Sequence, residues 1–228
     1  MINCCKICGE SYLVPLWHAC DVGFYRCLIC GCDSSDKTYE EVKHIYCIDY
    51  LKHNGTAEEN AEQMQTNIDW FEVYRKVAPS KDFLDIGHNE GGGLLAMQRM
   101  GWRVHGFDVN PVCDYGPHTT IAPCFAANLF PQKYGAVLCR EVIEHVEGWR
   151  QLLIEIHNVM LPGGLLQLQT PLPDRKNGPM VYQLAHLQIF TPHALKLYCR
   201  DAGFEVLDWM LWYGGERQPG QCGMLKRL

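Results

Sequence analysis

The chain has 228 residues, of which 47% are hydrophobic and 20% are charged. This length can bury one full core and carry a small appendage, which argues against two large domains. The formal net charge of −6 gives no general attraction to phosphate backbones, so any contact with a nucleic acid must be local. The first residues lack a signal-peptide pattern, and no segment has the roughly 20 apolar residues of a membrane span. We therefore expect a soluble, cytoplasmic protein with no membrane partner.

Cysteines are concentrated at the start of the chain, where seven of the 13 fall within the first 32 residues. An odd number of cysteines argues against a closed disulfide framework and for thiols in a reducing compartment. Two Cys-x-x-Cys-Gly turns stand 18 residues apart, a spacing typical of zinc ribbons. The predicted zinc ligands are Cys5, Cys8, Cys27 and Cys30.

Other interpretations of these cysteines are a redox Cys-x-x-Cys pair or simply buried thiols. Cys4, Cys20, Cys32 and His18 are possible substitute ligands or bystanders. A closed four-thiolate site stabilises a small fold and performs no chemistry. The N-terminal module, residues 1–34, is therefore predicted to position a substrate or a partner.

A linking helical region is predicted over residues 35–80. Thr56 and Glu59 fit the capping box that begins a helix, and the apolar spacing after them is helical. This helix is expected to run to about Val77 and to stop before Pro79.

Strands and helices alternate in the remaining domain, residues 81–228. Predicted strands are Asp82–Ile86, Arg103–Asp108, Ala136–Arg140 and Leu165–Gln169, and predicted helices are Leu94–Met100 and Trp149–Met160. Such alternation predicts an α/β fold with a doubly wound, mostly parallel sheet. At the end, Glu205–Tyr213 and Gln221–Lys226 look like a hairpin that adds an antiparallel strand.

A glycine-rich turn follows the first of these strands, in the stretch DFLDIGHNEGGGLL over Asp82–Leu95. In a doubly wound sheet such a turn lets backbone N–H groups meet a ligand beyond the strand ends. Asp108 lies 21 residues after Gly87, where an acid can accept both hydroxyls of a ribose. No lysine or arginine lies between Asp85 and Gln98, which favours an adenosine ligand without phosphates. The alternative is a turn that only packs a helix on the sheet.

Five stretches carry a family resemblance: FLDIGHNEGG, GFDVNP, AVLCREVIEHV, VMLPGGLLQLQTP and HLQIFTPHALKLYCRDAGFEV. In order and spacing they resemble the class I S-adenosylmethionine-dependent methyltransferases, particularly the branch of the ubiquinone-pathway O-methyltransferases. The resemblance covers roughly Phe83 to Val206. It implies a seven-stranded, Rossmann-like methyltransferase sheet and S-adenosyl-L-methionine as the cofactor.

The same resemblance implies a cofactor site. Asp85 and Gly87 would hold the methionine part, and Asp108 the ribose hydroxyls. The further candidates are Asn89, Gly91, Val109 and Arg140. Asn89 replaces the family's usual glycine; asparagine tolerates positive φ, but its side chain can crowd the cofactor.

The motif REVIEH places Glu141, Glu144 and His145 at positions i, i+3 and i+4, so a helix would put all three on one face at the cleft rim. In the ubiquinone O-methyltransferases and the small-RNA 3′-terminal 2′-O-methyltransferases, the matching residues ligate a divalent metal. The RNA enzymes add a later histidine, matched here by His186. Such ligands suit Mg, Mn or Zn. The alternative is a helix start whose acids complement the dipole.

The candidate catalytic residues are Glu141, His145 and His186. A metal would lower the pKa of an acceptor hydroxyl, and without a metal His145 or His186 is the candidate base. His193 is a weaker candidate because Thr191-Pro192-His193 looks like a helix start. Alignment of the acceptor with the methyl group would supply much of the catalysis.

The sequence thus predicts a methyltransferase that acts on an oxygen of a small molecule or a sugar. An RNA methyltransferase that binds its substrate through the zinc ribbon is one alternative. Another is a degenerate binding protein, which Asn89 and the unusual Arg140 motivate. Trp209 and Trp212 either line a substrate pocket or fill a sheet face. The acceptor and the oligomeric state stay open.

Overall fold

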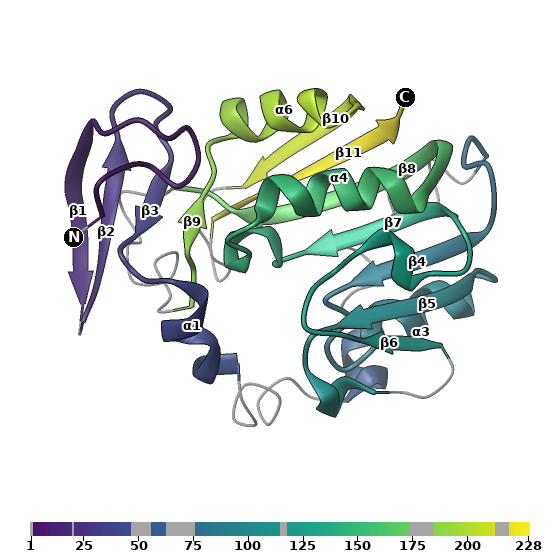
Figure 1. The fold of residues 1–228 in the computed structure, drawn as a ribbon. Coiled ribbons are helices and arrows are strands. Elements are labelled where there is room, and N and C mark those ends of the chain that lie inside the picture. The colour runs from purple at the N-terminus through teal and green to yellow at the C-terminus, as the bar shows by residue number, and fades with distance from the viewer. Residues whose placement is uncertain are drawn as a thin grey trace.

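The structure is a computed structural model that describes residues 2–19, 21–46, 56–62, 76–114, 118–173, 185–212 and 219–228. Strands within these residues form two sheets, one of seven strands and one of four (Figure 1). The smaller sheet lies beside the amino-terminal end of the chain, and the edge formed by β5 and β6 lies on the opposite side of the molecule (Figure 1). Among the helices that these ranges contain, none is long and apolar enough to cross a membrane.

The larger sheet has the strand order β10-β11-β8-β7-β4-β5-β6. Its strands are β4 (Asp82–Ile86), β5 (Arg103–Asp108), β6 (Thr119–Ile121), β7 (Tyr134–Arg140), β8 (Met160–Pro171), β10 (Phe204–Trp212) and β11 (Gly220–Arg227). The five strands from β6 to β8 pair in parallel, whereas β11 is antiparallel to both β8 and β10. The predicted doubly wound, mostly parallel, seven-stranded sheet with a terminal hairpin is confirmed.

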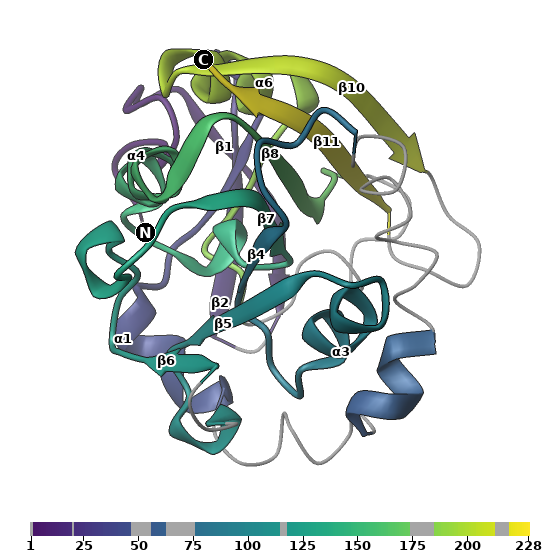
Figure 2. The ribbon, with the colours of Figure 1, turned by 90° about the vertical axis from the view of Figure 1, so that its right-hand side faces the viewer.

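Helices cover both faces of this sheet (Figure 2). They are α3 (Gly92–Arg99), α4 (Trp149–Val159) and α6 (Pro192–Asp201). In β4, Phe83 packs with residues of α3, whereas Leu84 and Ile86 pack with residues of α4 and α6. Because alternate residues of a strand point to opposite faces, α3 lies on one face and α4 and α6 lie on the other.

The predicted helix between Thr56 and Val77 is described only at its start, where residues 57–62 are helical and 63–75 lie outside the described residues. The predicted capping box is present. The backbone N–H of Thr56 donates to Glu59 Oε2 at 2.8 Å, and the backbone N–H of Glu59 donates to Thr56 Oγ1 at 3.2 Å.

The smaller sheet has the order β1-β2-β3-β9 and combines distant parts of the chain. Three strands come from the cysteine module: β1 (Leu13–Ala19), β2 (Val22–Cys27) and β3 (Asp33–Ser35). The fourth, β9 (Gln188–Ile189), pairs antiparallel with β3. The boundaries at residues 34 and 80 stay predictions, and the structure adds that the module contributes only part of its own sheet.

The cysteine module also shares the hydrophobic core of the larger domain. Ile7 is fully buried in the same cluster as Trp149 of α4 and Leu195 of α6. Its carbonyl accepts a hydrogen bond from Tyr198 Oη at 3.2 Å, and the Trp149 indole N–H donates to the Lys6 carbonyl at 3.2 Å. The module is therefore packed against the helical face that α4 and α6 form.

Candidate active site

A cavity of about 760 Å³ opens where the larger sheet changes its winding direction. Its lining includes residues at and after the carboxyl ends of β4, β5 and β7, which are residues 87–90, 108–110 and 140–142. The chain passes from β4 outward to β5 and β6 and then returns to β7 on the other side of β4. Such a switch point is where doubly wound sheets bind their ligands.

The turn after β4 needs left-handed backbone at three positions. The φ angles are 75° at Gly87, 50° at Asn89 and 83° at Gly91, the residue that precedes α3. A Cβ atom on Gly87 would lie 2.5 Å from Val142 Cγ2, and one on Gly92 would lie 2.8 Å from Asn60 Cβ. The glycines therefore allow both the turn and the close packing of protein side chains on its backbone.

Asp108 ends β5 with its carboxylate fixed beside this turn. Its Oδ2 accepts a hydrogen bond from the backbone N–H of Asn89 at 3.0 Å, and its Oδ1 accepts one from the backbone N–H of Asn110 at 2.9 Å. Val109 also lines the cavity and is exposed. Each carboxylate oxygen has a further lone pair, so Asp108 can still accept hydrogen bonds from hydroxyl groups of a ligand.

Asp85 near the end of β4 is only 3% exposed and lines the cavity. Burial raises the pKa of this carboxyl to about 7, and the nearby Arg140 opposes part of that shift. Burial likewise raises the pKa of Glu90. A cationic ligand beside these acids would favour their charged forms.

The segment after β7 differs from the predicted helix. Glu141 has φ of 53°, which turns the chain sharply, and only Ile143–His145 form a single 3₁₀ turn, η5. The backbone N–H of Glu141 bonds the Gln169 carbonyl at 3.0 Å, and its Oε1 accepts a hydrogen bond from Gln169 Nε2 at 3.1 Å. The prediction that Glu141, Glu144 and His145 share one helical face is therefore wrong, because Glu141 still belongs to the pairing of β7 with β8.

Three of the four predicted metal ligands do come together. Glu144, His145 and His186 each offer a ligand atom, and these atoms all lie within 4.8 Å of one another, whereas Glu141 stands outside this group. Glu144 is fully buried, and its Oε2 accepts a hydrogen bond from Thr170 Oγ1 at 2.9 Å. Burial and the neighbouring Glu141 raise the pKa of Glu144 well above its usual range.

His145 has a fixed tautomer. Its Nδ1 lies 3.0 Å from the carbonyl of Ala185, and since a carbonyl only accepts, Nδ1 carries a proton. The lone pair of the neutral ring is then on Nε2, which lies 3.7 Å from Glu144 Oε1. Burial and the adjacent His186 ring lower the pKa of His145 to about 3. This arrangement suits metal ligation, where a second group commonly holds the other ring nitrogen.

The candidate catalytic residues reach the cavity unequally. Glu141 and His145 line it, whereas Glu144 and His186 are buried and are not among the lining residues. His193 is exposed at the start of α6, where Thr191 caps the helix by accepting a hydrogen bond from the Ala194 N–H at 3.3 Å. His193 is not among the lining residues.

Sequence reasoning missed most of the other lining residues, among them Tyr39, Asn60, Glu147 and Glu155. Tyr39 begins α1 (Tyr39–Val42), and its backbone N–H donates to Glu147 Oε1 at 2.8 Å. The capping box of Thr38 and Glu41 indicates the start of this helix, but no local sequence pattern predicts that the helix lies at a cavity. The acidic lining residues are Asp85, Glu90, Asp108, Glu141, Glu147 and Glu155. Arg140 is the only lysine or arginine among the described lining residues.

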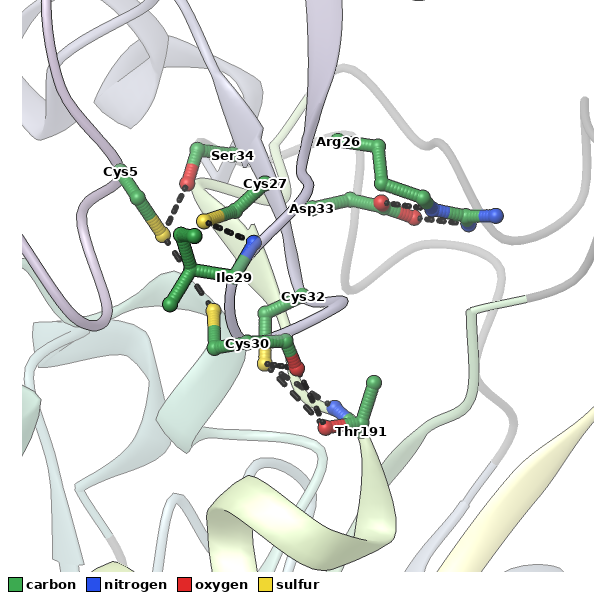
Figure 3. Close-up of polar contacts among 9 residues, drawn as sticks. All are labelled: Cys5, Arg26, Cys27, Ile29, Cys30, Cys32, Asp33, Ser34 and Thr191. Atoms are coloured by element: carbon green, nitrogen blue, oxygen red, sulfur yellow. Dashed lines mark hydrogen bonds and ion pairs between the residues drawn. The ribbon is translucent and has the colours of Figure 1, made fainter. Parts of the chain in front are cut away.

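The four cysteines of the predicted zinc ribbon also come together. Figure 3 shows three of them, Cys5, Cys27 and Cys30. The sulfur atoms of the four all lie within 4.8 Å of one another, with 3.7 Å between Cys5 and Cys30 and 3.5 Å between Cys8 and Cys27. Four thiolates at about 2.3 Å from a tetrahedral zinc ion are about 3.8 Å apart. The geometry of the sulfur atoms therefore fits zinc.

The bystander cysteines take other roles. Cys32 is buried, and its Sγ accepts a hydrogen bond from the Thr191 N–H at 3.3 Å (Figure 3). Cys4 is exposed and Cys20 lies outside the described residues. His18, on β1, is not part of the cluster. At the other end of the chain, Trp209 packs against the main core and Trp212 covers Gly220, and neither lines the cavity.

Comparison with known proteins identifies the family of the α/β domain that holds the cavity. Residues 45–208 match the methyltransferase-domain family. The mitochondrial ubiquinone biosynthesis O-methyltransferase of Schizosaccharomyces pombe is 32% identical over 123 residues, which are 46% of this chain and 44% of the relative. The chain thus spans less than half the length of that curated relative.

Solved structures show the same fold. A S-adenosylmethionine-dependent methyltransferase from Archaeoglobus fulgidus has a TM-score of 0.62 at 15% identity, over 80% of this chain and 99% of that one. The 1,6-didemethyltoxoflavin-N1-methyltransferase of Burkholderia thailandensis, with bound S-adenosylhomocysteine, has a TM-score of 0.62 at 16% identity, over 93% and 98%. With a match over residues 45–208, the chain belongs to the methyltransferase-domain family, and it has the fold of the S-adenosylmethionine-dependent methyltransferases.

Proposed function

We propose that the enzyme methylates an oxygen atom, a hydroxyl of a small molecule or of a sugar. One observation carries this proposal: a single cavity joins a cofactor half, lined by Asp85, Gly87 and Asp108, to an acceptor half lined by Glu141 and His145. The similar curated relative is, by its name, an O-methyltransferase. The proposal extends that chemistry to this chain.

The charge of the cavity supports a small acceptor over RNA. Glu141, Glu147 and Glu155 line the acceptor half, and among the described lining residues only Arg140 is a basic residue of the Lys or Arg type. A phosphate-rich substrate gains affinity from lysine and arginine contacts and loses it beside carboxylates. The acceptor is therefore neutral or cationic, and it carries hydroxyl groups that carboxylates can bind.

The cofactor-binding residues in this proposal are Asp85, Gly87, Asn89, Gly91, Asp108, Val109 and Arg140. When bound, the cofactor supplies a methyl group on a cationic sulfur. Asp85 and Asp108 present carboxylates to that part of the cavity, and the turn from Gly87 to Glu90 lines it beside them. The tasks of the acceptor half are to align the hydroxyl and to take up its proton.

His145 and Glu141 are the two groups placed for the proton. His145 Nε2 carries the lone pair of a neutral ring, but the pKa of about 3 makes it a weak base. Glu144, His145 and His186 would together hold a divalent ion such as Mn or Mg, and Glu144 and His186 are then its buried ligands. Such an ion would lower the pKa of an acceptor hydroxyl.

The cysteine cluster would hold one zinc ion as a closed structural site, with Cys5, Cys8, Cys27 and Cys30 as ligands. A reducing, cytoplasmic compartment is part of the same proposal, because the odd number of 13 cysteines argues against a closed disulfide framework.

The test is methyl transfer from methyl-labelled cofactor to three acceptor classes: catechols, sugars and short RNAs. We expect label in a catechol or a sugar with the wild type. With Asp108→Ala we expect no label when the cofactor concentration is far below the Kd of the variant for the cofactor. Label in RNA alone would overturn the small-molecule assignment. We also expect saturable heat on calorimetric titration with the cofactor, and the absence of such heat would support the degenerate binding protein instead.

A further inference from the structure

The short strand β9 lies between the cysteine module and the cavity wall. On the module side, Ser34 pairs with Gln188 and Asp33 pairs with Ile189. The backbone N–H of Ser35 donates to the Leu187 carbonyl at 2.9 Å. These contacts join β9 to the segment that directly follows the second cysteine turn.

Thr191, just after β9, is bound to the second cysteine turn itself (Figure 3). Its hydroxyl donates to the Cys30 carbonyl at 3.2 Å, and its backbone N–H donates to Cys32 Sγ at 3.3 Å. Cys30 is one of the four clustered cysteines. The chain after β9 is therefore tied to the cluster itself, and the chain before β9 is tied to Ser35 of the neighbouring strand β3.

On the other side, β9 holds the turn that carries His145. Gln188 is fully buried, and its Nε2 donates to the carbonyls of Ile143 and Val146, each at 2.8 Å. The Leu187 N–H donates to the Glu144 carbonyl at 2.9 Å, and the Ala185 carbonyl accepts from His145 Nδ1. One segment thus bonds four consecutive residues of the turn.

Neither element is stable alone. A three-residue 3₁₀ turn and a two-residue strand have too few internal hydrogen bonds to offset the entropy of ordering their backbones. If β9 moved, the Val146 carbonyl would lose its bond from Gln188, and the buried Ile143 carbonyl would keep only the long bond of 3.4 Å from the Val146 N–H. The position of His145 therefore depends on β9, and β9 depends on the cysteine module.

We propose that the four-cysteine site is a positioning device for the acceptor wall: a metal ion bound there fixes β9, and Gln188 transmits this order to His145. Gln188 is a positioning residue and touches no substrate. This inference rests on the proposed zinc site. The cofactor half is built by β4 and β5, which pair with each other away from the module, and so it stays independent of the metal (Figure 1).

A pair of buried glutamines provides the first test. Gln188→Met removes the donors that bond η5 and keeps a similar volume. Gln167→Met is the matched control, because Gln167 is 1% exposed on β8 and donates to Cys222 Sγ at 3.6 Å, away from β9. Hydrogen exchange of the His145 and Leu187 amides is the readout, together with zinc content and cofactor affinity.

We expect Gln188→Met to speed exchange at both amides about tenfold or more, the effect of losing buried hydrogen bonds. Zinc content and cofactor affinity should stay at the wild-type values, while turnover of the acceptor falls. Gln167→Met should leave both amides unchanged. Equal exchange in the two variants would overturn the role of Gln188.

Removal of the metal is the second test. In Cys27→Ser, or after chelation of the wild type, we expect faster exchange at Ser35, Leu187 and His145 and unchanged exchange at Leu84 in β4. Faster exchange confined to residues 2–35, or wild-type protein without zinc, would overturn the proposal. These readouts need no acceptor, so a failure of the proposed O-methylation is seen separately in the labelled-methyl assay.

Discussion

The two halves of the cavity are built in different ways. The cofactor half comes from two neighbouring parallel strands and the turns that follow them, and its acids, Asp85 and Asp108, stand on paired strands. The acceptor half comes from α1, η5 and α4, and α1 lies far from the other two in the sequence. In the cofactor half, the pairing of β4 with β5 fixes the positions of the two acids. In the acceptor half, the position of each lining segment depends on contacts with another part of the chain. Substitutions should therefore separate cofactor binding from acceptor turnover.

The largest expected effect is on turnover. If Glu144, His145 and His186 hold a divalent ion, His186→Ala should lower kcat by about a hundredfold or more while cofactor affinity is kept. Chelation should abolish turnover, and Mg or Mn should restore it. His193→Ala is the matched control, because His193 is an exposed histidine on α6. Steady-state rates and calorimetry give both quantities.

Glu141→Ala extends this test, because Glu141 lines the cavity but stands outside the group of three ligands. We expect it to lower kcat with no loss of bound metal, whereas His186→Ala should lower both. Full activity in either variant, or in protein stripped of divalent ions, would contradict the metal site. The REVIEH segment would then have a structural role, and catalysis would come from alignment of the acceptor with the methyl group.

The next effect is on the cofactor half. Asp108→Ala should weaken cofactor binding by roughly 1–3 kcal/mol, because it removes charge-assisted hydrogen bonds. It also leaves the N–H groups of Asn89 and Asn110 without their carboxylate. Calorimetric titration measures the loss, and Asp114→Ala, at an exposed position, is the control. An unchanged affinity would contradict the ribose assignment.

A smaller effect follows from the titration of Asp85, whose pKa is raised to about 7 by burial. A cationic cofactor favours the charged carboxylate, so binding below pH 7 releases a proton. Cofactor affinity should therefore rise about tenfold from pH 6 to pH 8 and then level off. Asp85→Asn should bind more weakly and without this pH dependence, and the same slope in that variant would assign it to another group.

In the unliganded protein, the ionisation of Asp85 makes stability change with pH in the direction opposite to cofactor affinity. Between the ordinary pKa of an aspartate and about 7, the folded state holds the Asp85 proton and the unfolded state does not. Asp85 therefore lowers the free energy of unfolding as the pH rises through this range. Cofactor binding and stability should thus respond to pH in opposite directions, which denaturant titrations with and without cofactor can measure.

The sequence predicts the cofactor half of the cavity better than the acceptor half. The cofactor half is local, so the glycine turn and the spacing from Gly87 to Asp108 already indicate an adenosine ligand, and the family resemblance adds the other predicted cofactor residues. The cysteine cluster is also set by spacing, through two turns of identical form. His186 was brought to Glu144 and His145 only by the family resemblance, because no local pattern joins residues 41 positions apart.

The acceptor half was less predictable for physical reasons. Left-handed backbone is rare for a glutamate, so helical spacing was applied to Glu141 where the chain instead turns. Strand β9 has only two residues and exists through its pairing with β3, more than 150 positions earlier. Tyr39 and Asn60 reach the cavity only through tertiary packing, which no periodicity encodes.

The smallest expected effect is at Asn89, where the cofactor half departs from its family. Asparagine at φ of 50° is tolerated, and glycine would relieve the left-handed strain while losing more entropy on folding. Asn89→Gly should therefore change the free energy of unfolding by only about 0.5 kcal/mol. Because the Asn89 side chain also lines the cavity, its removal should raise cofactor affinity up to about threefold.

Asn89→Ala separates the two causes, since alanine removes the amide group but keeps a strained backbone. If crowding limits binding, both variants should bind the cofactor more tightly, and only the alanine variant should lose stability, by about 1 kcal/mol. Thermal unfolding and calorimetry on the same samples measure both. A tenfold loss of affinity in both variants would mean that the Asn89 amide is itself a ligand of the cofactor. Asn89 would then be a cofactor ligand in its own right, and the departure from glycine would no longer count as evidence of degeneracy.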